Sequence, residues 1–373
     1  MTVLLRVVLD QLVSPTDPDL AMASRELAGA LARSAPDGCA VGAIVPSGGD
    51  DLRLPGIAEV RRMGMGRREL AAAWQLGVTA GTGGGLIHSP TLLAPFARHD
   101  RINDHDQIVV TLWDLQPWEN PDELSRTAHA WYKGMLKRAR KHADAVVVPT
   151  HAMADRLGEF VDLGARVRVI AGAAPTGFRV PGDAVGRRRA LAVPEAFLGL
   201  AVGTAPSASL PVALAAVAQS GVDLPIVVID GQADQEPTIV ELAEAVGIAP
   251  NRVHVRFDLS ADDRAALLDA SVLMLAPSRR SGFPWRVVEA LALGVPVVAA
   301  ASADHREVIV DGGLVVGSPT DDGQDAAALA DGILQALASD AALARLGVLS
   351  GDRGRAFTWH DAAARVWQLH ADL

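Results

Sequence analysis

Residues 277–298, PSRRSGFPWRVVEALALGVPVV, decide the fold because they read as a loop, a short helix and a buried strand in direct succession. Residues 285–293 carry apolar side chains at helical spacing, a glycine follows, and the next residues are all apolar. A loop that opens onto a helix N-terminus is a ready anion site, since free backbone N–H groups and the helix dipole point at it. Arg279 and Arg280 precede this N-terminus. We therefore expect a phosphorylated ligand here, with a hydroxylated part near Glu289.

The composition is that of a globular chain. Its 373 residues exceed what one hydrophobic core usually serves, so two domains are expected, and 50% of the residues are hydrophobic. The net charge of −10 argues against nucleic acid as a partner, because phosphate contacts need a basic surface. The single cysteine, Cys39, excludes an intrachain disulfide and fits a reducing cytoplasm.

No membrane-spanning segment is expected, because no uninterrupted run of about 18 apolar residues occurs. Arg6 and Asp10 break the apolar N-terminal run, which is too short for a signal peptide. The basic segment 133–142, KGMLKRARKH, allows a weak peripheral contact with anionic lipid. A solvated helix whose cations suit its C-terminal dipole is the favoured interpretation. The predicted location is the cytoplasm, with the inner face of the membrane as the peripheral alternative.

Predicted strands and helices alternate along the whole chain, which is the pattern of parallel sheets covered on both faces. In the first half we expect strands at residues 3–9, 40–45, 60–63, 85–88, 108–112, 145–148 and 166–170, and helices at 20–33, 69–76 and 124–142. In the second half we expect strands at residues 198–202, 226–230, 253–255, 271–276, 295–299 and 313–316, and helices at 210–220, 238–246, 261–270, 287–293 and 326–337.

The segment 171–183 separates the two series, because its three glycines and two prolines are typical of a linker. We expect one Rossmann-like domain over residues 1–178 and a second over residues 179–356. A C-terminal helix, residues 357–373, is expected to rejoin the first domain. The predicted fold class is α/β, with two Rossmann-like domains facing across a ligand cleft at the carboxyl ends of their strands.

Two motifs resemble known sites but fit them poorly. GTGGGL, residues 81–86, lacks the third glycine of a dinucleotide fingerprint and precedes no helix, so a loop into the next strand is the better interpretation. HDRINDHD offers His99, Asp104 and His105 as metal ligands, but their spacing matches no standard site and a solvated turn is favoured. No bound metal is therefore predicted.

Ordered sequence blocks run from the first domain to the last helix. They are LIHSPTLLAPF, VVTLWDL, HADAVVVPTHAMADRL, VRVIAGAAPTGF, PSRRSGFPWRVVEALALGVPVVAA, EVIVDGGLVV and FTWHDAAARVWQLH. Together they resemble glycosyltransferase family 4, the group 1 enzymes, over nearly the whole chain. The resemblance implies the GT-B fold, a retaining reaction, a nucleotide-diphosphate sugar as donor substrate, and no cofactor or metal.

The resemblance places the donor in the second domain. The second glutamate of the family's E-x(7)-E motif holds the nucleotide ribose and corresponds to Glu289, whose alternative role is an acid stabilised by the helix dipole. The first glutamate of that motif contacts the donor sugar and corresponds to Ser281. The family arginine and lysine that neutralise the leaving diphosphate correspond to Thr204 and Ser209. Two cations that stabilise the transition state are therefore replaced by hydroxyls.

The loop before the predicted helix contains further candidate donor-binding residues. Arg279 and Arg280 either compensate for the two missing cations, with Arg280 as the catalytic group, or they are exposed loop residues. Both interpretations carry equal weight. Pro284 replaces a flexible glycine of the family and removes a backbone donor. The donor-binding set implied by the resemblance is Gly203, Thr204, Ser209, Phe257, Arg279, Ser281, Gly282, Phe283 and Glu289.

The resemblance places the acceptor in the first domain. His88 corresponds to a family histidine beside the reacting sugar, where an imidazole can position or polarise a hydroxyl, although a structural role is the alternative. Asp114 is the retained acid of a motif in which Trp113 replaces histidine, and that indole can stack on a sugar ring. Asp17 is an acceptor candidate in the first loop, although a helix cap is the favoured explanation for it.

Two functions remain open. In the first, the chain is a retaining glycosyltransferase that moves a hexose from a nucleotide sugar to a hydroxyl of a carbohydrate or lipid-linked acceptor in polysaccharide or glycoconjugate biosynthesis. In the second, it is a catalytically degenerate GT-B protein that binds a nucleotide or a partner transferase without efficient turnover. Retention of Glu289, His88 and Asp114 favours the enzyme, whereas the replaced donor residues favour the degenerate protein.

Overall fold

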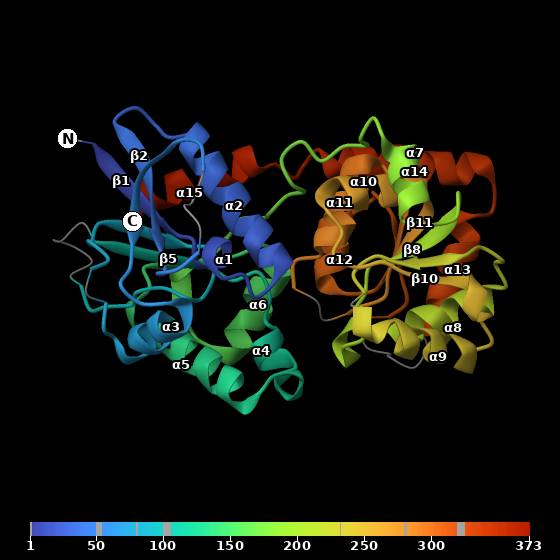
Figure 1. Cartoon of the computed structure of the whole chain (residues 1–373), viewed down its shortest axis with the longest axis horizontal. Helices are drawn as coiled ribbons and strands as arrows, with labels where there is room; N and C mark the ends of the chain where they lie inside the picture. Colours follow the sequence, from blue (N-terminus) through green and yellow to red (C-terminus); the bar gives the residue numbers. More distant parts are fainter. Residues whose placement is uncertain are drawn as a thin grey trace. The chain divides into compact units, whose positions relative to one another are not determined.

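The computed structural model divides the chain into two compact units (Figure 1). The structure describes residues 2–49, 54–79, 81–99, 106–231, 233–279, 282–318 and 325–373. The first unit contains the residues up to Gly172 together with Thr358–Leu373, and the second contains Ala173–Phe357. The chain passes from the first unit to the second between Gly172 and Ala173, which lies within the expected linker but before the expected boundary at residue 178. The C-terminal helix joins the first unit.

The first unit is built on a seven-stranded parallel sheet in the order β3-β2-β1-β4-β5-β6-β7. Its inner strands have buried side chains on both faces, as expected of a parallel sheet with helices on either side, whereas the edge strands β3 and β7 contain no fully buried residue. The strands are β1 Val3–Val8, β2 Cys39–Val45, β3 Ile57–Arg62, β4 Leu86–Ser89, β5 Gln107–Thr111, β6 Ala145–Val148 and β7 Val167–Val169.

Seven α-helices of the described chain surround this sheet. They are α1 Asp10–Val13, α2 Pro18–Arg33, α3 Arg67–Leu76, α4 Gln116–Glu119, α5 Arg126–His142, α6 His151–Phe160 and α15 Trp359–Asp372. The last helix, α15, packs on α2, and its Trp367 donates a hydrogen bond from Nε1 to the carbonyl of Leu31 (3.1 Å). This contact explains why the C-terminal helix belongs to the first unit, as the sequence predicted.

The second unit has a six-stranded parallel sheet in the order β10-β9-β8-β11-β12-β13. The strands are β8 Phe197–Leu200, β9 Ile226–Val228, β10 Val253–Val255, β11 Ser271–Ala276, β12 Val297–Ala300 and β13 Leu314–Val316. The helices are α7 Ala184–Ala190, α8 Leu210–Ser220, α9 Glu236–Ala245, α10 Ala261–Ala270, α11 Trp285–Leu293, α12 Ala303–Ile309, α13 Asp325–Ala336 and α14 Asp340–Gly354. Two parallel α/β units of this kind form the predicted GT-B fold.

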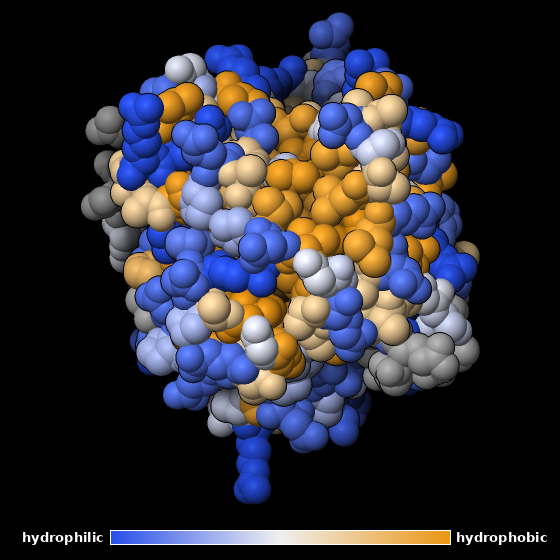
Figure 2. All heavy atoms as spheres, turned by 90° about the vertical axis from the view of Figure 1, so that its right-hand side faces the viewer, coloured by the Kyte–Doolittle hydropathy of each residue, from blue (hydrophilic) through white to orange (hydrophobic). Residues whose placement is uncertain are grey.

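The described residues of the stretch 277–298 fold as expected. Strand β11 leads into a loop, helix α11 follows, and Gly294 ends the helix in the left-handed conformation (φ 71°) that favours glycine. The all-apolar strand β12 comes next and is fully buried. On the surface of this unit, Leu334 and Val348 are exposed, and Figure 2 shows apolar side chains gathered among the polar ones on one face.

The order of strands locates a ligand site in each unit. In an open parallel sheet, ligands bind beyond the carboxyl ends of the strands at the point where the strand order reverses. This point lies between β1 and β4 in the first sheet, and between β8 and β11 in the second. In the part of the chain that is described, no single helix has the length and apolar composition needed to span a membrane.

The GTGGGL stretch is a loop, as the sequence indicated. Gly83 and Gly85 have φ angles of 90° and 74°, which side chains other than glycine rarely adopt. Strand β4 follows directly, so there is no helix N-terminus at which a dinucleotide pyrophosphate would bind. The glycines therefore serve the turn into β4.

Candidate functional site

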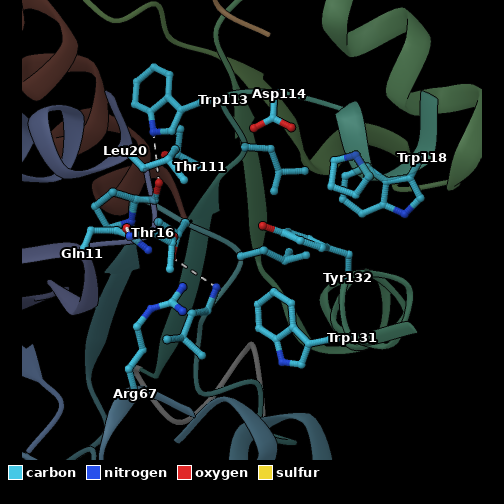
Figure 3. A pocket seen from close by; sticks show the side chains of 16 residues that line it. Gln11, Thr16, Leu20, Arg67, Thr111, Trp113, Asp114, Trp118, Trp131 and Tyr132 are labelled. Carbon is cyan, nitrogen blue, oxygen red and sulfur yellow. Dashed lines mark hydrogen bonds between the residues drawn. The ribbon is translucent and has the colours of Figure 1, made fainter. Parts of the chain in front are cut away.

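A cavity lies at the reversal point of the first sheet, beyond the carboxyl ends of β1, β4 and β5 (Figure 3). Its free volume is about 40 Å³. Because one water needs roughly 10–15 Å³ measured in this way, the cavity has room for a few small groups but not for a sugar ring. The lining residues are Gln11, Thr16, Leu20, Arg67, Pro90, Thr91, Leu92, Leu93, Thr111, Leu112, Trp113, Asp114, Pro117, Trp118, Trp131 and Tyr132.

Aromatic side chains form much of the cavity wall. Tyr132 packs edge to face against Trp131 and Trp118, with ring centroids 5.0 Å and 6.1 Å apart. Trp113 donates a hydrogen bond from Nε1 to the carbonyl of Pro90 (3.0 Å), which fixes its indole beside the cavity. The predicted acceptor residue Trp113 thus lies at the cavity, together with aromatic residues of α4 and α5.

Asp114 is the acid of this cavity. Burial raises the pKa of its carboxyl to about 6, although the backbone N–H of Gln116, which donates to Oδ1 (3.0 Å), lowers it. The negative charges of Asp17 and Glu119 raise this pKa further. No described residue donates a hydrogen bond to Oδ2 of Asp114. The group can therefore accept a hydrogen bond, or change protonation state, close to neutral pH.

A buried ion pair supports the opposite side of the cavity. Asp10 has no exposed surface and accepts a hydrogen bond at Oδ2 from Nε of Arg67 (2.7 Å). Gln11 and Thr91 also donate to its carboxylate. Burial raises the pKa of Asp10, and Arg67 opposes that rise. Figure 3 shows the Arg67 guanidinium and the Tyr132 hydroxyl pointing into the cavity.

His88 lies in the core and does not line the cavity, so the cleft-facing imidazole expected from the sequence is not found. It is the next-to-last residue of β4 and has no exposed surface, and its Nε2 is 2.9 Å from Oγ1 of Thr111. Its ring packs against His370 of α15, with centroids 5.7 Å apart. Burial lowers the pKa of His88 well below its usual range, and His370 adds to the effect. This conformation fits a structural role for His88, with a neutral imidazole.

Asp17 caps helix α2. Its Oδ1 accepts hydrogen bonds from the backbone N–H groups of Asp19 (2.8 Å) and Leu20 (3.0 Å), which have no partner within the helix. The cap favoured by the sequence is confirmed, and Asp17 itself does not line the cavity. It contributes negative charge near Asp114 instead.

The expected donor loops meet at the reversal point of the second sheet. The loop after β8 contains Gly203, Thr204 and Ser209, and the loop after β11 begins at Pro277. Ser278 donates a hydrogen bond from Oγ to the carbonyl of Ser207 (2.8 Å), so the two loops are in contact. This places the Thr204 and Ser209 positions beside the loop that leads to α11.

Glu289 is buried and bound by arginines, which disagrees with a ribose-binding carboxylate that faces a ligand. Only 1% of its surface is exposed. Arg264 donates to it from Nε (3.1 Å to Oε2) and Nη2 (2.8 Å to Oε1), and Nη1 of Arg286 lies 3.0 Å from Oε1. Arg286 also donates from Nε to Asp230 (2.9 Å). In this conformation Glu289 is the counter-ion of two arginines.

The remaining donor candidates are distributed between surface and core. Arg279 forms an ion pair with Asp325 at the start of α13, so its charge is already balanced. Phe283 is buried and packs edge to face on Trp285 (4.7 Å), which makes it a core residue. Phe257 is 40% exposed. Gly282 adjoins Phe283, and the candidates Arg280 and Ser281 lie outside the described residues.

The suggested metal ligands do not assemble in the described part of the chain. No group of three or more histidine, cysteine or acidic side chains there is suited to a metal. His99 is bound to Asp144 (3.0 Å), which itself accepts a hydrogen bond from the backbone N–H of Ile108 (2.7 Å). The other two suggested ligands, Asp104 and His105, lie outside the described residues.

Several cavity residues were not singled out from the sequence. Arg67, Tyr132 and Trp131 come from α3 and α5, whose faces are turned toward the sheet by apolar residues such as Leu70 and Met135. An amphipathic reading of α5 would have shown which of its faces is buried. It would not have shown that this face reaches the carboxyl end of β5.

Comparison with known proteins agrees with the fold. Residues 207–348 match the family described as glycosyl transferases group 1. D-inositol 3-phosphate glycosyltransferases from Corynebacterium diphtheriae and Xylanimonas cellulosilytica are 29% and 34% identical to the chain over 155 and 150 residues. These alignments span 40% and 39% of the chain, but only about a third of each relative (35% and 34%).

Solved structures match over nearly the whole chain. Sucrose-phosphate synthase from Thermosynechococcus elongatus has a TM-score of 0.74 at 20% identity, covering 99% of this chain and 98% of its own. HepE from Anabaena, in complex with UDP and glucose, has a TM-score of 0.69 at 18% identity and full coverage of both chains. WaaG, a glycosyltransferase involved in lipopolysaccharide biosynthesis, has a TM-score of 0.68 at 13% identity, with 98% of each chain covered. At these identities the likeness establishes the fold.

Proposed function

Because residues 207–348 belong to the glycosyl transferases group 1 family within a GT-B fold, we propose that the chain is a retaining glycosyltransferase. It transfers a hexose from a nucleotide-diphosphate sugar to a hydroxyl of a carbohydrate or lipid-linked acceptor, in polysaccharide or glycoconjugate biosynthesis. The observation that carries the proposal is the family match, which covers most of the second unit, including Ser209 and the loop after β11.

The donor part of the proposal uses the loops after β8 and β11. Departure of a nucleoside diphosphate builds negative charge, but the first turn of α8 offers few backbone donors for it, because residue 211 is proline and the N–H groups of Val212 and Ala213 donate to the carbonyl of Ser209. Thr204 and Ser209 offer hydroxyl donors in place of cations. For Glu289 to hold a ribose, Arg264 and Arg286 must first release its carboxylate. Donor binding is therefore expected to be weaker than in a site whose carboxylate is free.

The acceptor part of the proposal uses the cavity of the first unit. Asp114 and the indole of Trp113 lie together at its wall. Aromatic rings bind the apolar faces of sugars, and the carboxylate accepts hydrogen bonds from hydroxyls. Because the cavity is smaller than a sugar ring, the acceptor ring is expected at its mouth. The reaction takes place in the cytoplasm and needs no metal. A more specific version of this proposal adds a peripheral contact between α5 and lipid.

The second candidate is a degenerate GT-B protein, and the Arg264 and Arg286 contacts to Glu289 favour it. A protein of this kind would bind a partner transferase. One structure of similar fold is that of a GtfA/B complex, with a TM-score of 0.51 at 16% identity over 72% of this chain and 53% of its own. The exposed apolar side chains of the second unit (Figure 2) would suit such a contact.

Thermal unfolding with nucleotide diphosphates and nucleotide sugars tests the donor site. A ligand at 100 times its Kd stabilises the native state by about 2.7 kcal/mol. A shift together with transfer to an acceptor, unaffected by EDTA, supports the enzyme. A shift without transfer or donor hydrolysis supports the degenerate protein. No shift with any nucleotide contradicts donor binding and leaves a scaffold role.

A further inference from the structure

The size of the first-unit cavity limits what can enter it. About 40 Å³ accommodates roughly three water-sized groups, so a substituent of the acceptor can enter but its ring cannot. The substituent must satisfy the polar atoms that face the cavity. Among these, Oδ2 of Asp114 accepts no hydrogen bond from a described residue, and the Tyr132 hydroxyl makes none. The cavity therefore offers an acceptor oxygen beside aromatic faces.

The charges around the cavity are unequal. Asp10 of α1 is paired with Arg67 of α3, and Glu119 of α4 is paired with Arg156, both at 2.7 Å. No cation among the described residues pairs with Asp114, and Asp17 at the start of α2 adds negative charge. Burial raises the pKa of Tyr132 on α5 to about 12, and Asp114 adds to the rise more than Arg67 offsets it. On the Asp114 and Tyr132 side of the cavity the negative charge therefore dominates, whereas the positive charge of Arg67, which also lines the cavity, lies on the opposite side.

Aromatic faces and negative charge both favour a cationic ligand. The quadrupole of an aromatic ring attracts a cation within about 6 Å of its centroid. Trp113, Trp118 and Tyr132 all line the cavity with Asp114. A neutral hydroxymethyl group would gain the hydrogen bond but not the attraction to the rings. An anionic group would be repelled by the uncompensated carboxylate.

We propose that this cavity binds the protonated amino group of the acceptor, so that the acceptor is an amino sugar or a similar hydroxylated amine. The ammonium lies between the Asp114 carboxylate and the faces of Trp118 and Tyr132, and the ring that carries it lies at the cavity mouth. This inference rests on the proposed function, since it names the acceptor class of the same site.

Binding to the full chain without donor tests this inference separately from transfer. D-glucosamine, D-glucose and N-acetyl-D-glucosamine differ in one substituent, and their affinities at pH 7 can be compared by NMR titration. We expect glucosamine to bind at least tenfold more tightly than the two neutral sugars. Asp114→Asn should abolish this preference, and Trp118→Leu should reduce it. Tyr132→Phe keeps the ring and should preserve it.

Asp37→Asn is the matched control, because Asp37 is exposed in the loop before β2, at the amino edge of the same sheet. It should retain the preference for glucosamine. Equal affinities for glucosamine and glucose would overturn the inference, and so would a preference that survives Asp114→Asn in a variant with native circular dichroism. Transfer from a nucleotide sugar to neutral acceptors alone would overturn it as well, while leaving the proposed function intact.

Discussion

Replacing Glu289 by glutamine separates a structural carboxylate from a ligand-binding one. Glu289 is 1% exposed, and its partners Arg264 and Arg286 have side chains only 12% and 9% exposed. Glutamine keeps the size and one acceptor oxygen but removes the charge, so two buried guanidinium groups lose their shared counter-ion. Breaking a buried ion pair in this way costs roughly 3–5 kcal/mol, and the retained acceptor places the expected loss near the lower figure, about 3 kcal/mol.

Urea unfolding followed by circular dichroism measures this loss. For a unit of this size about 3 kcal/mol corresponds to a fall in Tm of about 6–12 °C. Glu195→Gln is the matched control, because Glu195 is exposed in the same unit and should change stability by less than about 0.5 kcal/mol. A Glu289→Gln variant of unchanged stability that has lost nucleotide binding would refute the reasoning, since the carboxylate would then act on the ligand and not on the arginines.

Three further changes test the description of the two units. The pKa of Asp114 is raised to about 6 in the folded chain, so its ionisation destabilises the fold as the pH rises from the pKa of the unfolded chain, near 4, to about 6. Asp114→Asn should therefore be more stable than the parent at pH 7. In thermal unfolding, this difference in stability should vanish near pH 4. Arg67→Met leaves Asp10 buried without its cation and should cost about 3 kcal/mol, whereas the double variant Arg67→Met/Asp10→Leu should recover much of it; an additive loss in urea unfolding would contradict this. Gly354→Ala places a methyl group against the carbonyl of Leu291 in α11 and should cost roughly 1–3 kcal/mol. The same change at Gly182, with open space around it, should not, and equal Tm values for both variants would disprove close packing at Gly354.

Much of the fold follows from local pattern, and one helix shows where this fails. Strands β6, β10 and β11 have the predicted bounds: β6 and β11 are short, almost wholly apolar runs, and in β10 two valines flank His254 in the alternating pattern of a strand. Helix α14 was not predicted, since its glycines lower its intrinsic helix propensity. These glycines permit close packing: a Cβ at Gly347 would lie 3.0 Å from the carbonyl of Gly294. Contact with α11 thus stabilises a helix that its own sequence disfavours.

Only the site residues whose position follows from the end of a strand could be predicted from the sequence. Trp113 and Asp114 come two and three residues after the end of β5, so the rule for parallel sheets places them at the carboxyl edge. His88 is near the end of β4, but its burial depends on contact with His370, far away in the sequence. Glu289 kept its position in the motif, yet its role depends on Arg264, which lies in another helix. Tertiary contacts of this kind leave no periodic signal in the sequence.

The return of helix α15 to the first unit has a consequence for how the chain is made. The ribosome synthesises all of the second unit before residues 358–373. The first unit therefore still lacks α15 when every residue of the second unit has been synthesised. Until α15 docks, the surfaces beneath Trp359 and Trp367 are uncovered, including one side of the Trp113 indole. The unit that is synthesised first therefore lacks the contact between Trp359 and the cavity residue Trp113 until residues 358–373 dock.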